Sequence, residues 1–372
     1  MTQIKQQSRS SATALGARLC INLGALVQNY QKLKDMAAPA QIAAVVKANA
    51  YGLGVKEVAL ALAGAGVKHF FVALVSEGTE LRQILNAHQY ERAEIYVFAG
   101  LQPNAEDHFI ENDLIPVLNS LQEIDRWAAC GDKPAAIHID TGMNRLGLSE
   151  QEAELLHGAP QRLKKLNLKL VMSHFACADE PEHPLNQRQI ERFVSLKNDL
   201  PPAPASLSNS AGIFLGQQAL FDLVRPGIAL YGGNPQPGTP NPMAPVISLS
   251  APILQIREVA PGESVGYGAA FRTNTFSRIA ILPLGYADGF LRSFGEKATI
   301  MVDDTLIPIV GRISMDLIAL DVTAIDKDRI KVGDSIEILG RSRTIDDLAL
   351  AGSTIPYEIL TLLGHRYERQ YL

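Results

Sequence analysis

The sequence predicts an α/β plus β protein of two domains, in which a (β/α)₈ barrel precedes a mostly β domain. Up to about residue 230, short β-rich runs alternate with longer stretches of helical periodicity, a pattern typical of a barrel of parallel strands. The proline- and glycine-rich stretch 232–245 then predicts a linker, and short strand-like runs follow it. We therefore expect a barrel over residues 17–235, a β domain over 236–372, and a loose tail over 1–16.

Eight strand-like runs account for the barrel, and helix-patterned stretches such as 55–66 and 187–200 lie between them. The active site of such a barrel is built at the carboxyl ends of its strands. Polar residues at those ends are therefore the first candidates for function. The runs are IAAVV (42–46), HFFVALV (69–75), EIYVF (94–98), LIPVL (114–118), AAIHID (135–140), LKLVMSH (168–174), ASLSN (205–209) and FDLVR (221–225).

The second domain is predicted from six further runs rich in β-branched and aliphatic residues. They are SAPILQIREV, RIAILPL, TIMVDD, TLIPIVG, LIALDV and SIEILG. Residues 17–24, which contain RLCINL, precede the first barrel strand and could pair with the second domain. The sequence alone leaves that pairing open.

Composition limits the class of protein. With 372 residues, 47% of them hydrophobic and 20% charged, the chain is long enough for one large core and a second domain. Its net charge is −5 and its basic residues are scattered, so we expect no nucleic-acid partner. The three cysteines lack C-x-x-C spacing, which argues against disulfides and suits a cytoplasmic protein. The polar residues 1–16 lack the apolar run of a signal peptide, so we expect none, and no later apolar stretch approaches the roughly 20 residues of a membrane helix.

One lysine stands at the end of a predicted buried strand, in the stretch AAVVKANAYGLG. Lys47 could be a surface residue that caps the strand, because charged side chains are rarely buried. It could instead be an amine held in a pocket, where a depressed pKa lets it form a Schiff base with a carbonyl. Its place at a strand's carboxyl end favours the second interpretation.

Other polar residues follow the later barrel strands. Each has an ordinary structural explanation, such as a loop ion pair for Arg145, a hydrogen-bonded core position for His174 or a helix N-cap for Ser210. Their coincidence at one barrel rim indicates a site. The residues are Asp140, Arg145, His174, Asn209, Ser210, Arg225 and Gly227.

The last two barrel strands carry a candidate phosphate site. Ser210 and the backbone amides of Gly227 and Ile228 are donors of the kind that hold a phosphate, and barrels often place such a site there. A lysine for an imine, a phosphate cradle and a nearby arginine fit pyridoxal phosphate as the cofactor. Nothing in the sequence resembles a metal site.

Nine motifs together resemble those of the alanine racemases, pyridoxal-phosphate enzymes that interconvert L- and D-alanine. VKAN alone is weak, since related decarboxylases share it, but the set is specific. The resemblance runs from about residue 17 to 372. In family order the motifs are AVVKANAYGLG, HIDTGMNRLG, SHFACAD, SNSAG, RPGIALYG, VGYGAAF, LPLGYADG, GRISMD and IPYEIL.

The resemblance implies racemisation by two bases. Lys47 would carry the cofactor and act as one base, and Tyr267 of the partner subunit would be the other. Two are needed because one group removes the Cα proton from one face and the other returns a proton to the opposite face. The pKa of tyrosine is near 10, so Tyr267 would need nearby cations to ionise, and the resemblance assigns that neighbourhood to His174 and Arg225. Arg225 would also donate to the pyridine nitrogen, which would then stay unprotonated and leave the cofactor a weaker electron sink.

The same resemblance implies which residues bind the cofactor and the alanine substrate. Arg145 would contact the phenolic oxygen of the cofactor and the substrate carboxylate, which the Met315 amide also meets. Asp316 adjoins that carboxylate, and Tyr286 lines the pocket. The protein would be a homodimer, with Tyr267 and Met315 supplied in trans. The cofactor-binding residues would be Lys47, Tyr51, Arg145, His174, Asn209, Ser210, Arg225, Gly227, Ile228 and Tyr357.

One position departs from the family pattern. Many alanine racemases carry a carboxylated lysine seven residues before the motif arginine and bonded to it, whereas this chain has His138 there. An imidazole cannot replace the negative charge of a carbamate. We expect a bound anion or another carboxylate to orient Arg145 instead; alternatively, His138 is simply a packed strand residue.

Three functions remain open at this point. The chain could be an alanine racemase, in a biosynthetic route to peptidoglycan or a catabolic one, or a racemase of broader specificity. A decarboxylase of the same plan is less well supported, because its second domain would bring a cysteine into the site and all three cysteines here precede the linker. A non-enzymatic pyridoxal-phosphate-binding protein would end near residue 230, and this chain continues for a whole domain.

Overall fold

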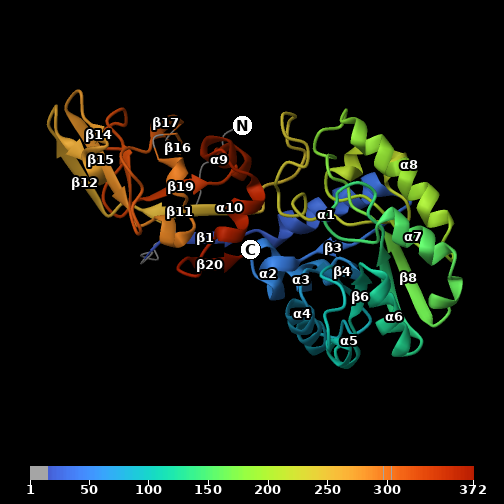
Figure 1. Cartoon of the computed structure of the whole chain (residues 1–372). Coiled ribbons are helices and arrows are strands. Elements are labelled where there is room, and N and C mark those ends of the chain that lie inside the picture. The colour runs from blue at the N-terminus through green and yellow to red at the C-terminus, as the bar shows by residue number, and fades with distance from the viewer. Residues whose placement is uncertain (1–15, 296, 303) are drawn as a thin grey trace, which may run out of the picture. The chain divides into compact units, whose positions relative to one another are not determined.

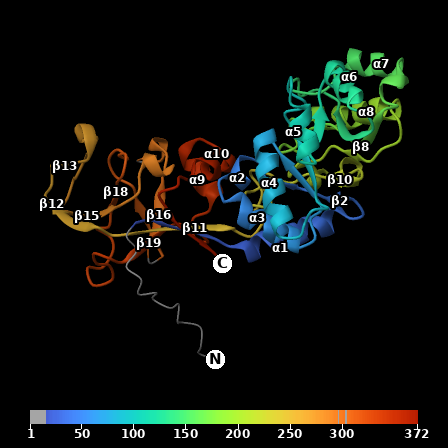
Figure 2. The ribbon, with the colours of Figure 1, turned by 90° about the horizontal axis from the view of Figure 1, so that it is seen from below.

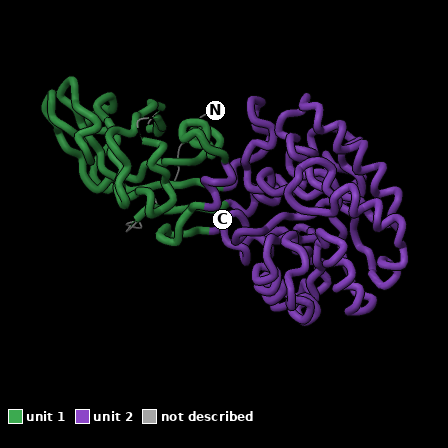
Figure 3. The backbone as a smooth tube through the Cα atoms, viewed as in Figure 1, with its two compact units in different colours: residues 1–21, 247–355, 362–370 green, residues 22–246, 356–361, 371–372 purple. Residues whose placement is uncertain are grey.

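The computed structural model describes residues 16–295, 297–302 and 304–372, which form two compact units (Figure 3). Unit 1 contains the described residues up to Ile21, together with Ile247–Ile355 and Leu362–Gln370. Unit 2 contains Asn22–Val246, Pro356–Thr361 and Tyr371–Leu372. The chain therefore crosses between the units more than once, whereas the sequence predicts two consecutive domains. Residues 1–15 of the predicted tail lie outside the described residues.

Unit 2 is a barrel of parallel strands (Figure 1). Its main sheet has the order β3-β4-β5-β6-β7-β8-β9, and β10 pairs in parallel with β2. The Val45 amide donates to the Pro226 carbonyl at 3.1 Å, which closes the ring between the last and the first strands. The predicted barrel is confirmed. The strands are β2 (Gln41–Ile42), β3 (Ala44–Val45), β4 (His69–Val72), β5 (Glu94–Val97), β6 (Ile115–Leu118), β7 (Lys133–His138), β8 (Leu166–Met172), β9 (Ala205–Ser206) and β10 (Leu223–Val224).

Helices alternate with these strands and lie outside them (Figure 2). In the helix over Val55–Gly64, the buried side chains follow the i, i+3, i+4, i+7 spacing of one apolar face. None of the helices in the described ranges is long and apolar enough to span a bilayer. The α-helices are α1 (Leu23–Ala37), α2 (Lys47–Tyr51), α3 (Val55–Gly64), α4 (Val75–Ala87), α5 (Glu106–Glu111), α6 (Leu121–Ala129), α7 (Glu150–His157), α8 (Pro184–Asn198) and α10 (Pro356–Leu362), and the 3₁₀ helices are η1 (Pro160–Arg162), η2 (Gly212–Leu215) and η3 (Gln217–Ala219).

Two predicted barrel strands end earlier than the sequence suggests. The run 42–46 is divided, because β2 pairs with β10 whereas β3 pairs with β4. The run 69–75 stops at Val72, since the Ala73 and Leu74 amides donate to the Glu77 carboxylate at 2.8 and 3.0 Å and begin α4. Apolarity continues past the strand in both places, so it does not mark the strand's end.

Unit 1 contains most of the β structure that the sequence predicts after the linker. It has a four-stranded sheet of order β19-β11-β1-β20, a three-stranded sheet of order β12-β15-β18 and the hairpins β13-β14 and β16-β17. β1 pairs antiparallel with β11, so residues 18–21 belong to this unit. The elements are β1 (Arg18–Ile21), β11 (Ile247–Pro252), β12 (Gln255–Val259), β13 (Ser264–Val265), β14 (Phe271–Arg272), β15 (Ser277–Leu282), β16 (Thr299–Val302), β17 (Thr305–Pro308), β18 (Ile318–Asp321), β19 (Ser335–Leu339), β20 (Glu368–Tyr371), α9 (Ile345–Gly352), η4 (Tyr267–Ala269), η5 (Tyr286–Asp288) and η6 (Arg292–Phe294).

Candidate active site

A cavity of about 450 Å³ lies at the carboxyl ends of the barrel strands, within unit 2. Its wall brings together residues from loops that are far apart in the sequence. Apolar side chains, among them Phe98 and Met172, line the rest. All ten residues predicted to bind the cofactor lie on this wall: Lys47, Tyr51, Arg145, His174, Asn209, Ser210, Arg225, Gly227, Ile228 and Tyr357.

Lys47 begins a tight turn with an uncommon backbone conformation. It follows β3, and the next residues, Ala48, Asn49 and Ala50, have φ between 52° and 53° and ψ between 49° and 55°. For residues other than glycine, this left-handed conformation costs roughly 1–2 kcal/mol per residue. Backbone bonds from Ala50 to Val46 and from Gly52 to Ala48, at 2.9 and 2.8 Å, close the turn. The lysine is thus held by a strained but well-bonded segment.

The surroundings of the Lys47 amine lower its pKa, which makes the neutral form more accessible. Burial is the main cause that lowers the pKa of Lys47, the charge of Arg145 lowers it further, and the charge of Glu77 opposes both. Its Nζ atom lies 5.9 Å from the centroid of the Phe98 ring. A neutral amine is the form that attacks a carbonyl.

The C-terminal part of the chain completes this region of unit 2. Helix α10 brings Tyr357 to the cavity and packs on the Lys47 turn, where Gly52 has φ +82° and a Cβ on it would lie 2.3 Å from the Leu360 carbonyl oxygen. The Tyr371 hydroxyl donates to the Leu53 carbonyl at 2.9 Å. Only glycine fits at position 52, because it combines a positive φ with a backbone in contact.

Arg225 lies on the cavity wall with 2% of its surface exposed. Its Nη2 donates to the Ser173 carbonyl at 2.6 Å and to His174 Nδ1 at 3.4 Å, and its Nη1 donates to Ser206 Oγ. Burial lowers the pKa of Arg225 to about 9, so the guanidinium is charged at neutral pH. Its buried Nε has no hydrogen-bond partner among the described residues. A buried donor without a partner costs stability, so this position calls for an explanation beyond the fold itself.

His174 differs from the expectation that it acts as a cation. An arginine only donates, so the contact with Arg225 makes His174 Nδ1 the acceptor and leaves the proton on Nε2. Burial, and then the charges of Arg225 and Arg145, lower the pKa of His174 well below its usual value. His174 is therefore neutral at pH 7, and of this pair only Arg225 supplies positive charge.

Hydroxyl groups gather at the end of the cavity near β9 and β10. Ser210 Oγ accepts from the Gly227 and Ala229 amides at 2.9 and 3.2 Å, so its own proton remains to be donated. Burial raises the pKa of Tyr51, and it raises that of Tyr357 to about 12, so both phenols keep their protons. The Tyr51 ring stacks on Tyr231 with centroids 4.6 Å apart. Three protonated hydroxyls near a tight backbone turn fit the predicted phosphate.

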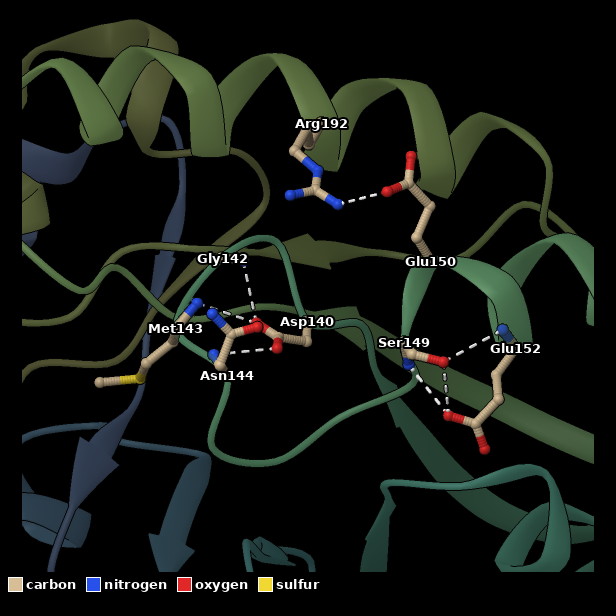
Figure 4. Close-up of polar contacts among 8 residues, drawn as sticks. All are labelled: Asp140, Gly142, Met143, Asn144, Ser149, Glu150, Glu152 and Arg192. Atoms are coloured by element: carbon tan, nitrogen blue, oxygen red, sulfur yellow. Dashed lines mark hydrogen bonds and ion pairs between the residues drawn. The ribbon is translucent and has the colours of Figure 1, made fainter.

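The loop that carries Arg145 is anchored at its base (Figure 4). The Asp140 carboxylate accepts from the Gly142, Met143 and Asn144 amides, each at 2.9 Å, so Asp140 organises the loop. Helix α7 follows directly, with Ser149 and Glu152 in a capping box, and Glu150 pairs with Arg192 of α8 at 2.6 Å. Arg145 itself is exposed and has no ion-pair partner among the described residues. The loop's base is rigid while its arginine is available.

His138 is neutral and its tautomer is fixed. Asn119 donates through Nδ2 to the Val117 and Phe98 carbonyls at 2.8 and 3.3 Å, so its Oδ1 accepts from His138 Nδ1 at 2.9 Å. Burial, and then the charge of Arg225, lower the pKa of His138 to about 4. His138 thus lines the cavity as a buried acceptor through Nε2 and supplies no negative charge.

Four predicted site residues lie in unit 1 and do not line this cavity. Three of them are largely exposed in the single chain: Tyr267 is 72%, Met315 53% and Tyr286 44% exposed. The Tyr286 and Ala287 amides donate to the Ser314 and Met315 carbonyls at 3.1 and 3.0 Å, which joins two of these loops. Asp316 pairs with Arg366 at 2.8 Å. Tyr286, Met315 and Asp316 therefore lie on two joined loops of unit 1.

Two residues near the cavity were not predicted. Asn119 fixes the tautomer of His138, and Glu77 accepts the Ala48 amide at 2.6 Å, directly after Lys47. A signal for Glu77 was present, since glutamate is typical of the third position of a helix. Nothing in the sequence indicates that its carboxylate also reaches the preceding strand's loop.

Comparisons with known proteins cover nearly the whole chain. Family models described as the alanine racemase N-terminal and C-terminal domains match residues 21–235 and 246–371. The chain is 44% identical to an alanine racemase of Rhizobium meliloti over 371 residues, covering 96% of this chain and 97% of that protein. It is 45% identical to a catabolic alanine racemase of Mesorhizobium japonicum, covering 97% of this chain and 95% of the relative.

Solved structures agree with the sequence comparisons. An alanine racemase of Bartonella henselae with covalently bound pyridoxal phosphate matches with a TM-score of 0.91 and 39% identity, over 96% of this chain and 99% of that one. A biosynthetic alanine racemase of Pseudomonas aeruginosa matches with a TM-score of 0.88 and 33% identity, over 96% and 99% of the two chains. On this combined similarity of sequence and fold, the chain belongs to the alanine racemase family.

Proposed function

We propose that this protein interconverts L-alanine and D-alanine with pyridoxal phosphate bound through Lys47. The observation that carries the proposal is one cavity whose wall combines Lys47, with its lowered pKa, with Arg225 and the hydroxyl-bearing residues Tyr51 and Ser210. When bound, the cofactor supplies an electron sink for the negative charge left when the Cα proton departs. Family membership favours this racemase over a decarboxylase or a non-enzymatic binding protein.

The residues around the cavity divide the work of holding the cofactor. The hydroxyls of Tyr51, Ser210 and Tyr357, with the Ile228 amide, would hold the phosphate. The Gly227 amide donates to Ser210 Oγ at 2.9 Å and would act by positioning that hydroxyl. Arg225 would donate to the ring nitrogen and keep it unprotonated, since an arginine does not give up its proton. Asn209 and His174 complete the wall.

Proton transfer uses one base on each face of the substrate. Lys47 Nζ takes or returns the Cα proton on one face, and Tyr267 Oη does so on the other. Arg225 supports the phenolate of Tyr267 by charge, while neutral His174 offers only its Nε2 proton. Because each face of the substrate has its own base, the reaction can run in both directions, and no proton has to move from one face to the other.

We further propose a homodimer in which Tyr267 and Met315 come from the partner subunit. The exposure of both side chains in the single chain, 72% and 53%, supports this assembly. Mixing inactive Lys47→Ala and Tyr267→Phe chains should then restore some activity, because a heterodimer assembles one site with both bases. Failure to restore activity despite demonstrated subunit exchange would place Tyr267 in its own chain's site.

Arg145, Met315, Tyr286 and Asp316 are proposed to recognise the substrate. Arg145 and the Met315 amide bind its carboxylate, Asp316 adjoins it, and Tyr286 lines the pocket. Because His138 is neutral and no described carboxylate pairs with Arg145, we propose that a bound anion orients this arginine. Replacing chloride with a larger anion in the assay buffer should raise KM for alanine, and an unchanged KM would remove this part of the proposal.

The biological setting is proposed on separate grounds. All three cysteines are free, which suits a reducing compartment, and we propose the cytoplasm. Relatives are named both with and without the word catabolic, so D-alanine supply for peptidoglycan and D-alanine breakdown are both compatible with the family.

Two measurements test the proposed function. Borohydride reduction of the purified protein should fix the cofactor on Lys47, which peptide mass spectrometry identifies. A coupled D-amino-acid oxidase assay over a panel of L-amino acids should give high activity with alanine and little with bulky side chains. Label on another lysine contradicts the cofactor assignment, and comparable activity across the panel would identify a racemase of broader specificity.

A further inference from the structure

One carboxylate joins the loops that follow two neighbouring barrel strands. Glu77 is the third residue of α4, and its Oε2 accepts the Ala73 and Leu74 amides after β4. Its Oε1 accepts the Ala48 amide, after β3, at 2.6 Å. The helix cap alone would need only one of these oxygens. The second oxygen is committed to the peptide directly after Lys47.

That peptide needs such support. Ala48 has φ +52° and ψ +51°, a conformation that is unfavourable for any residue with a Cβ, and the three residues after it also have positive φ. A strained backbone persists only where surrounding contacts overdetermine it. Asn49 gives one such contact, since its Oδ1 accepts the Val55 amide at 2.7 Å. Glu77 gives the contact nearest to Lys47, and it is the one made by a charged group.

We propose that Glu77 is a positioning residue that holds the Lys47 turn in its left-handed form and so aims the lysine amine for capture of the cofactor. The proposal rests on the proposed role of Lys47. Glu77 reaches no atom of the reaction and acts only through the Ala48 peptide and through its charge.

The charge of Glu77 also faces the lysine. Three charged or titratable groups surround Lys47: Glu77 from α4, Arg145 from the loop after β7 and His174 after β8. Of the first two, Arg145 lowers the pKa of Lys47 and Glu77 raises it. Neutralising Glu77 should therefore lower the pKa of the lysine and shift the pH dependence of cofactor capture toward acid.

Two substitutions separate the reach of Glu77 from its charge. Glu77→Asp keeps the negative charge and the cap of α4 but withdraws the carboxylate by one methylene from Ala48. Glu77→Gln keeps the length and removes the charge. Glu80→Gln is the matched control, because Glu80 is an exposed residue of the same helix.

The experiment follows cofactor capture by the full chain after removal of bound cofactor, using the absorbance change on adding pyridoxal phosphate across a pH range. Glu77→Asp and Glu77→Gln should each slow or weaken capture by about 10- to 100-fold, the effect of losing one charge-assisted hydrogen bond. Only Glu77→Gln should shift the pH profile. Glu80→Gln should match the parent. Parent-like capture by both Glu77 variants would overturn the proposal.

A second-site change distinguishes the turn from a simple helix cap. Glycine adopts a positive φ without strain, so Ala48→Gly should restore at least part of the capture lost by Glu77→Asp. No restoration in a folded double variant, judged by the parent's melting temperature, would mean that Glu77 only caps α4. If borohydride fails to label Lys47 in the parent, the proposed function fails first; if labelling succeeds and the Glu77 variants capture normally, only this inference fails.

Discussion

Titratable side chains lie at both ends of the barrel, but they have few partners at the carboxyl end and several at the amino end. At the carboxyl end, Lys47 and Arg145 have no carboxylate in an ion pair with them among the described residues, and each lowers the pKa of a neighbour. At the amino end, a second cavity of about 770 Å³ contains His69 and Glu94, at the starts of β4 and β5. There His69 contacts Glu94 at 2.9 Å and Gln41 at 2.8 Å.

This difference in hydrogen bonding distinguishes residues that serve the reaction from residues that stabilise the fold. At the amino end, Tyr96 also donates to Glu94 at 2.7 Å, and the hydrogen bond with His69 is the main cause that lowers the pKa of Glu94. Such a network stabilises the fold, because both ring nitrogens of His69 have partners. At the carboxyl end, the free Nε of Arg225 and the clustered cations cost stability, and this cost is typical of functional sites.

The sharpest way to break this comparison is to remove the lysine. Lys47→Ala should lower racemase activity by about 10⁴-fold, because it removes both the covalent anchor and one base. With bound cofactor removed from both proteins, the melting temperature should stay the same or rise, since Lys47 is partly buried without an ion-pair partner among the described residues. A coupled D-amino-acid oxidase assay and a thermal melt measure both effects. A clear loss of stability would show that Lys47 does not lower the stability of the fold, which contradicts the comparison.

Arg225→Glu should have the next largest effect. Without the guanidinium, the ring nitrogen can keep a proton and the cofactor becomes a stronger electron sink, while Tyr267 loses help in ionising. We expect racemisation to fall by about 10²-fold, with a new long-wavelength absorbance in the presence of alanine and more transamination per turnover. The exposed Arg188→Glu is the control. Parent-like racemisation without a new band would contradict the role of Arg225.

The lowered pKa of His138 predicts how the stability of the folded protein depends on pH. Its pKa is about 4 in the folded protein and 6.5 in the unfolded chain, so the unfolded chain binds the extra proton between these values. Stability should fall as pH drops from 6.5 toward 4, by about 3 kcal/mol at roughly 1.4 kcal/mol per pH unit. His138→Gln should flatten this decline in denaturant melts, whereas the exposed His108→Gln should not. An unchanged slope would show that His138 is not the group responsible.

Glu94→Gln should give the smallest effect and should act on stability alone. The pKa of Glu94 is lowered from 4.5, so its stabilisation is present above that value and is lost as pH falls through the folded-state pKa. At pH 7 we expect about 1–2 kcal/mol less stability with activity within about twofold of the parent. Glu91→Gln, on an exposed neighbour, is the control. A large loss of activity would mean that the amino-end network also serves the reaction.

The sequence predicted the barrel and the residues of its carboxyl rim because strand alternation and strand ends are local patterns. It could not predict the left-handed turn, since Ala48, Asn49 and Ala50 carry no glycine to signal a positive φ. It expected a cationic His174, but burial and four neighbouring positive or titratable groups make that residue neutral. Such effects depend on which loops meet in space, and so does the contact from Glu77 to Ala48.

The predicted domain boundary did not include the return of residues 356–361 to unit 2, for a similar reason. A linker at 232–245 is visible in composition, but the pattern of residues 356–361 does not say which unit they join. Their assignment to unit 2 follows from packing, above all the contact between Gly52 and Leu360. Tyr357 was predicted to bind the cofactor from its motif, and only the fold explains how it reaches the cavity.

This return has a consequence for the protein's synthesis on the ribosome. The barrel strands are complete once residue 224 has emerged, but the Lys47 turn lacks α10 and Tyr371 until residues 356–371 have been made. Domains tend to fold as they emerge, N-terminal first, at about 5–20 residues per second. The nascent barrel must therefore wait several seconds with its lysine pocket unfinished. Cofactor loading is thus expected to follow translation, and a chain truncated before residue 356 would fold a barrel that cannot close its site.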